Sequence, residues 1–471
     1  MKLGKKTKIV CTIGPATESE EKIESLIEAG MNVMRLNFSH GNFSEHQQRI
    51  DNLKKVLERT GETVATIQDL SGPKIRIGEF ENGSIILKDG QTFTLTTDSI
   101  IGNEERVSVN YPLFTKEVKV GGYVLLHDGK KKLQITDIKG NDVITKVIIG
   151  GELKNKKGVN LPGAYLSMSS ITEKDREDLK FAIKNDIDFI ALSFVRRPSD
   201  ISELRDLLKE MNLDAGIIAK IETPEALDNI DEIIKLSNGI MVARGDLAIE
   251  IPAEEVPLVQ KMLIQKCNAL GKPVITATQM LESMIKSSTP TRAEVSDIAN
   301  AIIDGTDAIM LSEETTLGEY PIQAVEMMTR ISLQVEKDVF TTDTIAEYED
   351  SHGITDVTCQ SAVLAAHEVE ARFLVALTKS GRTARMLARY RPTERIIAMT
   401  LTEASARKLT LSFGCYPIVT KKFDTIPEIM SAVKELVKKY HIASEGDKVV
   451  IVAGLLFSNV RETNLMLIEA I

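Results

Sequence analysis

The sequence contains few cysteines, and their spacing does not fit a zinc site. The four cysteines in 471 residues are Cys11, Cys267, Cys359 and Cys415, with no CxxC pair among them. This scatter is typical of a reduced cytoplasmic chain and argues against a disulfide framework or a zinc ribbon. We therefore interpret all four as packing thiols.

The chain also lacks excess positive charge and any apolar run long enough to span a membrane. It has 58 Lys and Arg against 68 Asp and Glu, a formal net charge of −10. This balance argues against nucleic acid or a membrane as a partner. The opening MKLGKKTKIVCTIG has the order of a secretory signal, but its apolar run is too short and an acidic helix follows at once. An anionic substrate would need a local cluster of cations.

What the chain does contain is a strand followed by an amphipathic helix, repeated eight times. The predicted strands are KIVCTIG, VMRLNFS, VATIQDL, FIALSFV, GIIAKIE, GIMVARGDL, PVITATQM and AIMLSEET. Strict alternation of this kind predicts a parallel (β/α)8 TIM barrel, formed by residues 1–74 and 159–338. A doubly wound sheet is the alternative, although it usually has fewer strands.

Two further segments interrupt or follow the barrel. Residues 75–158 are rich in short β segments separated by Gly and Asn-Asp turns, which predicts an inserted all-β domain. Because it follows the third strand at the end where barrel active sites lie, it is a candidate lid; a decorative insertion is the alternative. Residues 339–471 predict a separate α/β domain.

Charged side chains close the strands within residues 217–252. Lys220 and Glu222 lie two apart, as do Arg244 and Asp246, so the period of a strand would place each pair on one face at its C-terminal tip. Two carboxylates among cations suit a divalent metal that holds an anionic substrate. The competing interpretation is a pair of structural ion pairs.

Other predicted strands also end in polar residues. These are Arg35, Asn37 and Ser39 on the second strand, Asp69 on the third, Thr276 and Thr278 on the seventh, and Ser312 and Glu314 on the eighth. Six of the eight strand tips are thus predicted to point polar groups at one place. Barrel interiors are normally filled with branched apolar side chains, so this concentration indicates an active site.

The C-terminal segment has its own candidate site. A strand runs through Thr378, Lys379, Ser380, Gly381, Arg382 and Thr383 directly into a helix. Free backbone N–H groups and hydroxyls at a helix start predict a phosphate cradle. A plain helix N-cap is the alternative.

Taken together, these features resemble the pyruvate kinase family. The matching stretches, in order, are TKIVCTIGPA, MRLNFSHG, GPKIR, KGVNLPG, KIET, GIMVARGDL, ITATQML, PTRAEVSDIANAIIDGTDAIMLS and TKSGRTA. The resemblance implies a barrel with a β lid and a C-terminal regulatory α/β domain. It further implies transfer of the phosphoryl group of phosphoenolpyruvate to ADP, Mg2+ (or Mn2+) as cofactor, and a cytoplasmic homotetramer.

The resemblance also implies roles for individual residues. Glu222 and Asp246 would hold the metal, Lys220 and Arg35 would stabilise charge on the phosphoryl group, and Gly245, Asp246 and Thr278 would bind the substrate. Thr278 with Ser312 would relay a proton to the enolate carbon. The nucleotide side would comprise Asn37, His40, Arg76 and Lys157.

One departure from the family concerns a monovalent cation. Most members have glutamate after Gly-Pro where this chain has Lys74, and that glutamate accompanies a bound K+. The corresponding region here is Asn37, Ser39, Asp69, Leu70 and Lys74. Because the lysine ammonium supplies a positive charge of its own, we expect activity without K+.

The effector and two competing functions stay open at this stage. The turn Gly454 to Asn464 is bulky and contains Glu462, which disfavours a second phosphate, so a sugar monophosphate or a nucleotide is as plausible an effector as a sugar bisphosphate. A barrel lyase acting on pyruvate enolate would share Lys220, Glu222 and Asp246. A catalytically silent, effector-binding homologue is the other alternative.

Overall fold

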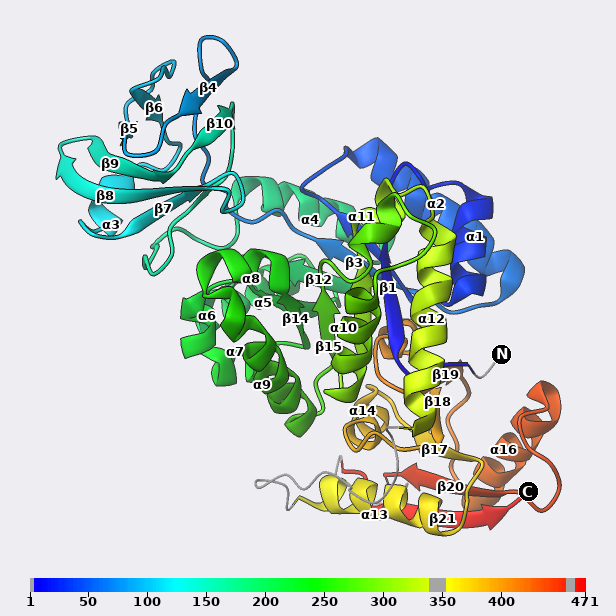
Figure 1. Cartoon of the computed structure of the whole chain (residues 1–471). Helices are drawn as coiled ribbons and strands as arrows, with labels where there is room; N and C mark the ends of the chain where they lie inside the picture. The colour runs from blue at the N-terminus through cyan, green and yellow to red at the C-terminus, as the bar shows by residue number, and fades with distance from the viewer. Residues whose placement is uncertain (1–3, 339–352, 455–461) are drawn as a thin grey trace.

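The computed structural model describes residues 4–338, 353–454 and 462–471. Three parts follow one another in space (Figure 1). A barrel surrounded by helices lies in the centre, a β-rich part projects from one end, and an α/β part lies against the other. The chain termini are both on the side of the α/β part.

The central part is a closed barrel of eight parallel strands. The strands are β1 Lys8–Thr12, β2 Val33–Asn37, β3 Ala65–Asp69, β12 Phe189–Leu192, β13 Gly216–Ile221, β14 Gly239–Ala243, β15 Val274–Ala277 and β16 Ala308–Leu311. They close in the order β1-β16-β15-β14-β13-β12-β3-β2. The predicted (β/α)8 barrel is confirmed, and closure excludes the doubly wound sheet.

Helices cover the outside of the barrel. They are α1 Glu20–Ala29, α2 Phe43–Thr60, α4 Glu173–Asn185, α5 Pro198–Glu210, α6 Pro224–Asp228, α7 Ile230–Leu236, α8 Arg244–Glu250, α9 Val256–Ala269, α10 Arg292–Ile303, α11 Glu313–Thr316 and α12 Pro321–Asp338. Capping boxes fix two of their starts, Thr172 with Asp175 before α4 and Thr291 with Glu294 before α10. Among the described residues, no helix has both the length and the apolar character to cross a membrane.

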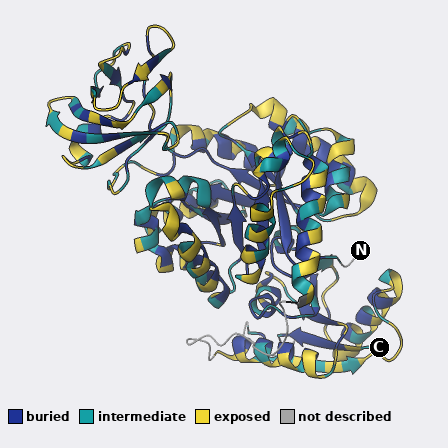
Figure 2. Cartoon of the chain, viewed as in Figure 1, coloured by how far each residue is buried: buried dark blue, intermediate teal, exposed yellow. Residues whose placement is uncertain are grey.

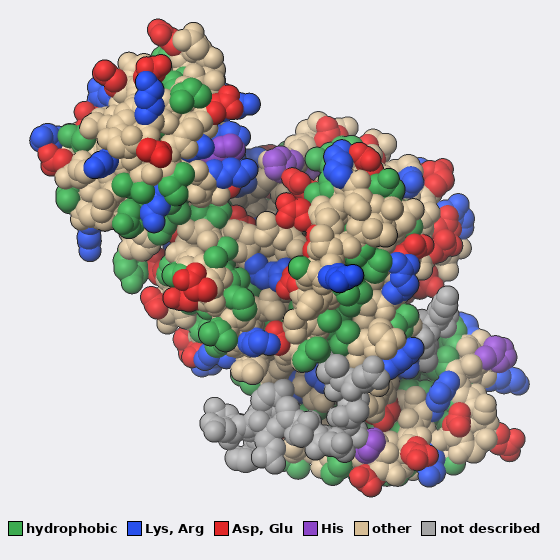
Figure 3. All heavy atoms as spheres, viewed as in Figure 1, with side chains coloured by type: hydrophobic (Ala, Val, Ile, Leu, Met, Phe, Trp, Pro, Cys, Tyr) green, Lys and Arg blue, Asp and Glu red, His purple; other side chains and the backbone are tan. Residues whose placement is uncertain are grey.

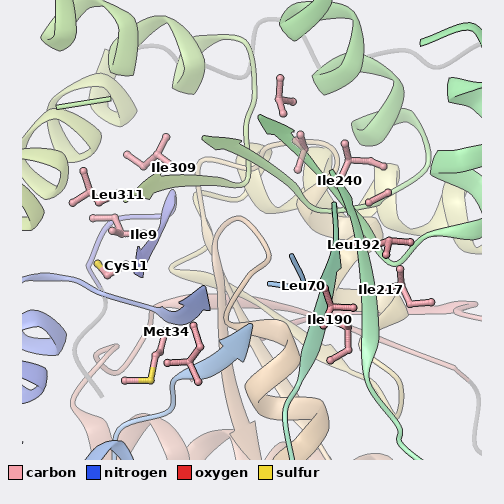
Figure 4. Close-up of a cluster of buried hydrophobic side chains, with 14 of the residues drawn as sticks. Ile9, Cys11, Met34, Leu70, Ile190, Leu192, Ile217, Ile240, Ile309 and Leu311 are labelled. Atoms are coloured by element: carbon pink, nitrogen blue, oxygen red, sulfur yellow. The ribbon is translucent and has the colours of Figure 1, made fainter. Parts of the chain in front are cut away.

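The barrel core has two layers because side chains on a strand alternate between its faces. Outward-facing residues such as Ile9, Cys11, Ile309 and Leu311 pack against the helices (Figure 4). Inward-facing residues such as Val10 fill the barrel itself. The strands are therefore buried throughout, while the helices are exposed only on their outer faces (Figure 2).

The inserted part is built almost entirely from strands. It contains β4 Ser84–Leu87, β5 Thr92–Thr96, β6 Arg106–Ser108, β7 Tyr123–Leu126, β8 Lys131–Lys139, β9 Asp142–Ile149, β10 Gly151–Lys154 and β11 Val159–Asn160, with one helical turn, α3 Phe114–Glu117. Six strands form a sheet in the order β11-β7-β8-β9-β5-β6, and β10 pairs with β4. It encloses a hydrophobic core of its own.

The C-terminal part is a five-stranded sheet with helices. Its elements are α13 Ile354–Glu368, β17 Phe373–Leu377, α14 Arg382–Ala388, β18 Arg395–Thr400, α15 Glu403–Leu409, β19 Cys415–Val419, α16 Ile426–Tyr440, β20 Lys448–Ala453 and β21 Leu465–Ala470. The strand order is β19-β18-β17-β20-β21, with only β21 antiparallel. The predicted separate α/β part is confirmed.

Polar contacts fasten this part to the N-terminal end of the barrel strands. Arg391 Nη2 lies 3.0 Å from Asp307, just before β16, and Arg407 Nε lies 2.8 Å from Asp188, just before β12. Lys8 Nζ donates to the carbonyl oxygen of Cys415 at 2.6 Å. The C-terminal part thus lies opposite the strand tips where the sequence predicts chemistry.

Candidate active site

On four barrel strands, the inward-facing positions are apolar along the strand and become polar at its C-terminal end. Val33, Ile67, Ala191 and Ile218 lie inside the barrel, and two positions further along stand Arg35, Asp69, Ser193 and Lys220. Because alternate side chains share a face, these four polar groups meet at the open end of the barrel interior.

Asp69 holds two cations in this cluster. Its Oδ2 accepts from Arg35 Nε at 2.8 Å, and its Oδ1 lies 3.4 Å from Lys220 Nζ. Arg35 Nη1 also donates to Thr12 Oγ1 at 2.8 Å. Burial alone would raise the pKa of Asp69, but Lys220 and Arg35 outweigh it and hold that pKa below its usual value. The ionised Asp69 therefore fixes the direction of both cations.

Lys220 makes the densest set of contacts in the site. Its Nζ lies 2.9 Å from Glu222 Oε1 and donates to Ser193 Oγ at 2.7 Å. Ser193 in turn donates to the carbonyl oxygen of Leu70 at 2.8 Å. Burial alone would lower the pKa of Lys220, but the carboxylates, led by Asp69, raise it above its usual value. The ammonium stays charged and is rigidly placed.

Glu222 and Asp246 form the candidate metal site. Glu222 is 1 % exposed and accepts from the backbone N–H of Phe194 at 2.7 Å, whereas the Asp246 side chain has no hydrogen-bond or ion-pair partner in the described residues. Burial raises the pKa of Glu222; Lys220 lowers it, and the like charge of Asp246 raises it further. A cation between the two carboxylates would relieve this repulsion.

These two carboxylates fit Mg2+ on chemical grounds. The described residues contain no group of three or more His, Cys, Asp or Glu placed to hold a metal. Mg2+ is often bound through one or two carboxylates, with substrate phosphates and water completing its coordination. A two-carboxylate site therefore fits a metal that is shared with a phosphate-bearing substrate.

The end of β14 differs from the prediction. Arg244 and Asp246 do not share a strand face, because helix α8 begins at Arg244. Residues two apart in a helix point roughly 200° apart. Arg244 turns away from the centre and donates to Asp297 at 2.6 Å and to the carbonyl oxygen of Thr278 at 2.8 Å. It braces the neighbouring strand tip.

Thr278 reaches the site through an unusual backbone conformation. Thr278 and Gln279 have φ values of 70° and 53°, which are uncommon for residues other than glycine and are often found at functional sites. Thr278 Oγ1 accepts from the N–H of Gly245 at 2.8 Å and donates to the carbonyl oxygen of Ala277 at 2.6 Å. The hydroxyl thus connects the tips of β14 and β15.

Two other polar tips do not point at the centre. Ile275 and Ala277 face the barrel interior, so Thr276 faces outward, where its hydroxyl donates to Thr306 at 3.0 Å. Glu314 is 2 % exposed and accepts from the backbone N–H groups of Leu281 and Ser312. The sequence predicted that Thr276 and Glu314 would point at the centre with the other polar residues of the six strand tips. For these two residues the prediction is wrong. Ser312 is half-buried at the end of β16.

The predicted monovalent-cation region is occupied by contacts within the protein. Lys74 Nζ donates to Ser39 Oγ at 3.0 Å, and Asn37 Oδ1 accepts from the N–H of Ser39. Both oxygens of Asp69 face cations, and the carbonyl of Leu70 accepts from Ser193. Burial lowers the pKa of Lys74, as do Lys220 and Arg76, so its ammonium belongs to the electrostatics of the site.

The predicted nucleotide side lies beside a hollow between the barrel and the inserted part. Figure 3 shows this hollow with basic and histidine side chains at its rim. A cavity of about 260 Å³ opens there, and Lys74, Arg76 and Asp246 are the sequence-predicted residues among its lining. Burial lowers the pKa of His40, with further lowering by Lys74, Arg35 and Arg76. The structure thus gathers Lys74 and Arg76 at this mouth, while Asn37, His40 and Lys157 lie outside the cavity lining.

The predicted effector loop leads from β17 into α14. Within the described residues, the backbone N–H groups of Lys379, Ser380 and Gly381 have no hydrogen-bond partner, and Gly381 has a φ of 82°. Thr383 is buried, and its hydroxyl is hydrogen-bonded with that of Thr463 at 2.8 Å. Of the turn from Gly454 to Asn464, residues 455–461 lie outside the described residues.

Sequence reasoning missed three groups that this geometry brings into the site. Ser193 and Thr12 contact Lys220 and Arg35, and the backbone N–H of Phe194 binds Glu222. Ser193 and Thr12 continue the inward register of β12 and β1, so strand parity would have found both. Phe194 has a φ of 53°, and no local sequence pattern indicates this conformation.

Comparisons with known proteins agree with this architecture. Residues 4–325 match the family model "Pyruvate kinase, barrel domain", and residues 356–469 match "Pyruvate kinase, alpha/beta domain". The pyruvate kinase of Geobacillus stearothermophilus is 48% identical over 472 residues, covering 99% of this chain and 80% of that protein. That of Bacillus licheniformis is 49% identical over 467 residues, covering 98% and 80%. A solved pyruvate kinase from Cryptosporidium parvum matches with a TM-score of 0.94 at 39% identity, covering 99% and 96% of the two chains.

Proposed function

Because the chain belongs to the pyruvate kinase family, we propose that its strand-tip cluster is the site of phosphoryl transfer. The activity is transfer of the phosphoryl group of phosphoenolpyruvate to ADP, which gives pyruvate and ATP. Neither the lyase nor the silent homologue is supported by the family assignment. The observation that carries the site is Lys220, whose Nζ contacts Asp69, Glu222 and Ser193 at 3.4, 2.9 and 2.7 Å.

In the proposed mechanism, Lys220 and Arg35 stabilise the phosphoryl group while it is being transferred. The bond from phosphorus to the enol oxygen breaks as the bond to the terminal phosphate oxygen of ADP forms, and negative charge is spread over the transferred group. Two cations fixed by Asp69 meet this charge without reorganising during the reaction. Mg2+, when bound by Glu222 and Asp246, would supply Lewis-acid stabilisation of the enolate and the phosphoryl oxygens.

Thr278 and Ser312 are proposed to serve the second half of the reaction. The enolate becomes pyruvate when its terminal carbon takes a proton. The Thr278 hydroxyl is held between Gly245 and Ala277; it would donate its proton to that carbon and regain one from solvent through Ser312. A Cβ at Gly245 would make an ordinary contact with Thr278 Oγ1 at 3.4 Å, so glycine here would serve the substrate carboxylate by leaving the space beside this hydroxyl open. A coupled assay of pyruvate formation, with and without ADP and Mg2+, tests the function; pyruvate released without ADP would contradict it.

The inserted part is proposed to act as a lid over the nucleotide side, with Asn37, His40, Arg76 and Lys157 facing ADP. Its tip approaches the barrel, because a Cβ at Gly129 would lie 3.6 Å from Ile249 of α8. Asn160 Nδ2 donates to Glu250 at 2.9 Å across the same junction. These contacts support the proposal that the inserted part closes onto α8, next to Asp246.

We also propose that this enzyme works without K+. Lys74 occupies the region with its own ammonium, and the oxygens of Asp69 and Leu70 are already bound. With Na+ or an organic cation in place of K+, the rate should change by less than about twofold, because a fixed charge replaces the ion. The measurement is the coupled assay in K+-free buffer, and a large loss of rate there would contradict the proposal.

Lys74→Glu should convert the enzyme to K+ dependence. The substitution removes the ammonium and restores an acidic group, so activity without K+ should fall by at least about tenfold and return when K+ is added. Lys54→Glu, the same charge change on an exposed residue of α2, is the matched control. Equal rates for Lys74→Glu with and without K+ would show that Lys74 does not replace the ion.

We also propose how the enzyme is regulated and assembled, from the geometry of the effector loop and from family membership. The N–H groups of residues 379–381, which have no partner in the described part of the chain, support an effector phosphate at Thr378 to Thr383, from a sugar phosphate or a nucleotide. A homotetramer and a cytoplasmic location are proposed from family membership. Thermal stabilisation by a panel of sugar phosphates and nucleotides identifies the effector.

A further inference from the structure

A second basic site lies between the barrel and the C-terminal part. A small cavity of about 10 Å³ opens there. It is bounded by the turn before β15 on the barrel side and by α14 and its C-terminal end on the other side, which lie next to each other in Figure 1. We call it the interdomain cavity; its lining includes Lys272, Arg385, Arg389, Arg391 and Ser412.

Two of these cations have no acidic partner among the residues that the structure describes. Lys272 Nζ donates only to the carbonyl oxygens of Lys235 and Ser237, at 3.2 and 2.6 Å, and Arg385 Nη1 donates to that of Ser380 at 3.2 Å. Burial lowers the pKa of Lys272, and the neighbouring charge of Arg385 lowers it further. Burial likewise lowers the pKa of Arg385. Both side chains are half-buried, and two like charges that lie close together are unfavourable unless an anion lies between them.

The other two arginines are already paired. Arg389 Nη1 lies 2.8 Å from Asp356, and Arg391 Nη2 lies 3.0 Å from Asp307. Asp307 is the acidic residue in the lining of the cavity, so it is committed to Arg391. The charge of Lys272 and Arg385 is therefore uncompensated within the part of the chain that the structure describes.

Unsatisfied donors face the same cavity. The hydroxyl of Ser412, a residue only 1 % exposed, and Nε of Arg391 have no hydrogen-bond partner among the described residues. Arg391 also has a φ of 49°, an uncommon conformation that directs its side chain to this junction. A buried donor without a partner is unfavourable, and a bound acceptor would satisfy it.

We propose that the interdomain cavity binds a small oxyanion, either inorganic phosphate or the phosphate group of a phosphomonoester. The cavity volume of about 10 Å³ is close to the size of one water molecule and would admit a single oxygen of the anion, which could satisfy the Ser412 hydroxyl. The remaining oxygens would lie at the mouth between Lys272 and Arg385, where arginine offers planar paired donors that match a phosphate.

This site is separate from the effector loop but joined to it. Arg385 lies on α14, one turn beyond the loop, and its guanidinium reaches the carbonyl oxygen of Ser380 within the loop. Lys272 lies two residues before β15 and Asp307 immediately before β16, and Thr278 and Ser312 directly follow these two strands. An anion held by Lys272 and Arg385 would tie the loop to two strands of the catalytic barrel.

The test measures phosphate binding to the full-length enzyme by calorimetry and thermal shift, at constant ionic strength with chloride as the balancing anion. Lys272→Met and Ser412→Ala should each weaken the Kd for inorganic phosphate by about tenfold, because each loses a donor to a charged group. Both residues lie away from the effector loop and the strand tips. Glycerol phosphate in a parallel arm distinguishes a phosphomonoester from the free ion, and binding of either supports the site.

Lys379→Ala, in the effector loop, is the comparison variant: it should weaken only phosphate binding at that loop and leave the binding that depends on Lys272 and Ser412 in place. Lys272→Met also removes the hydrogen bonds to the carbonyl oxygens of Lys235 and Ser237, so its melting temperature is measured without phosphate as well. A variant that is still folded at the assay temperature but binds phosphate more weakly separates lost binding from lost folding. Phosphate affinity that falls in Lys379→Ala but not in Lys272→Met or Ser412→Ala would overturn the proposal. Stabilisation by chloride equal to that by phosphate would overturn it as well.

Discussion

Lys220→Met should lower kcat by at least about 10³-fold, because the ammonium is the charge best placed to stabilise the transferred phosphoryl group and no other group can replace it. Its Nζ is held by Asp69, Glu222 and Ser193, and the Lys220 side chain is 12% exposed, so water cannot easily take its place. Steady-state kinetics with saturating phosphoenolpyruvate, ADP and Mg2+ give the value. The KM for phosphoenolpyruvate should change much less than kcat, since the stabilisation acts on the transition state.

Two control variants test whether the loss of kcat is specific to the ammonium of Lys220. Lys235→Met, which removes an exposed lysine paired with Glu232 on α7, should keep full activity. Lys220→Arg restores the charge but not the compact ammonium, so it should recover only part of the rate. A Lys220→Met enzyme that retained more than about a tenth of wild-type kcat would contradict the assignment.

The inward register of the barrel strands could be predicted from sequence because it depends only on alternation. Arg35, Asp69 and Lys220 each lie two residues beyond an inward apolar residue, and the structure brings the three together. The same rule would have found Ser193. Strand parity fails where the strand has already ended, since the next residues no longer alternate.

The errors fall at such endings. Helix α8 begins at Arg244, so Arg244 and Asp246 point in different directions, and the positive φ of Thr278 turns that side chain inward while Thr276 faces outward. These conformations are set by tertiary contacts such as Arg244 to Asp297, which lie 53 positions apart. The interdomain cavity likewise depends on Arg391 meeting Asp307 across 84 positions. Neither contact has a local pattern in the sequence.

Asp69→Asn should lower both stability and activity, because this one buried carboxylate forms ion pairs with two cations. Asp69 is 1 % exposed, and its loss would leave Arg35 and Lys220 facing only a neutral amide. Breaking a buried pair in this way costs about 3–5 kcal/mol of unfolding free energy. Chemical denaturation of the barrel transition measures the loss. Activity should fall as well, by roughly 10²-fold, because Arg35 and Lys220 would no longer be held in place.

The pH dependence separates this role from a simple packing defect. Since the folded-state pKa of Asp69 lies below its usual value, its contribution to stability is complete above the unfolded-state pKa, about 4. It is lost as the pH falls through the lower folded-state pKa. The difference in unfolding free energy between wild type and Asp69→Asn should therefore be constant at neutral pH and become smaller in strong acid.

Asp98→Asn provides the matched control. The carboxylate of Asp98 pairs with Arg106 at 2.9 Å but is 44% exposed, so its substitution should lower the unfolding free energy by no more than about 1 kcal/mol. Equal losses for the two variants would mean that Asp69 does not hold the cationic pair.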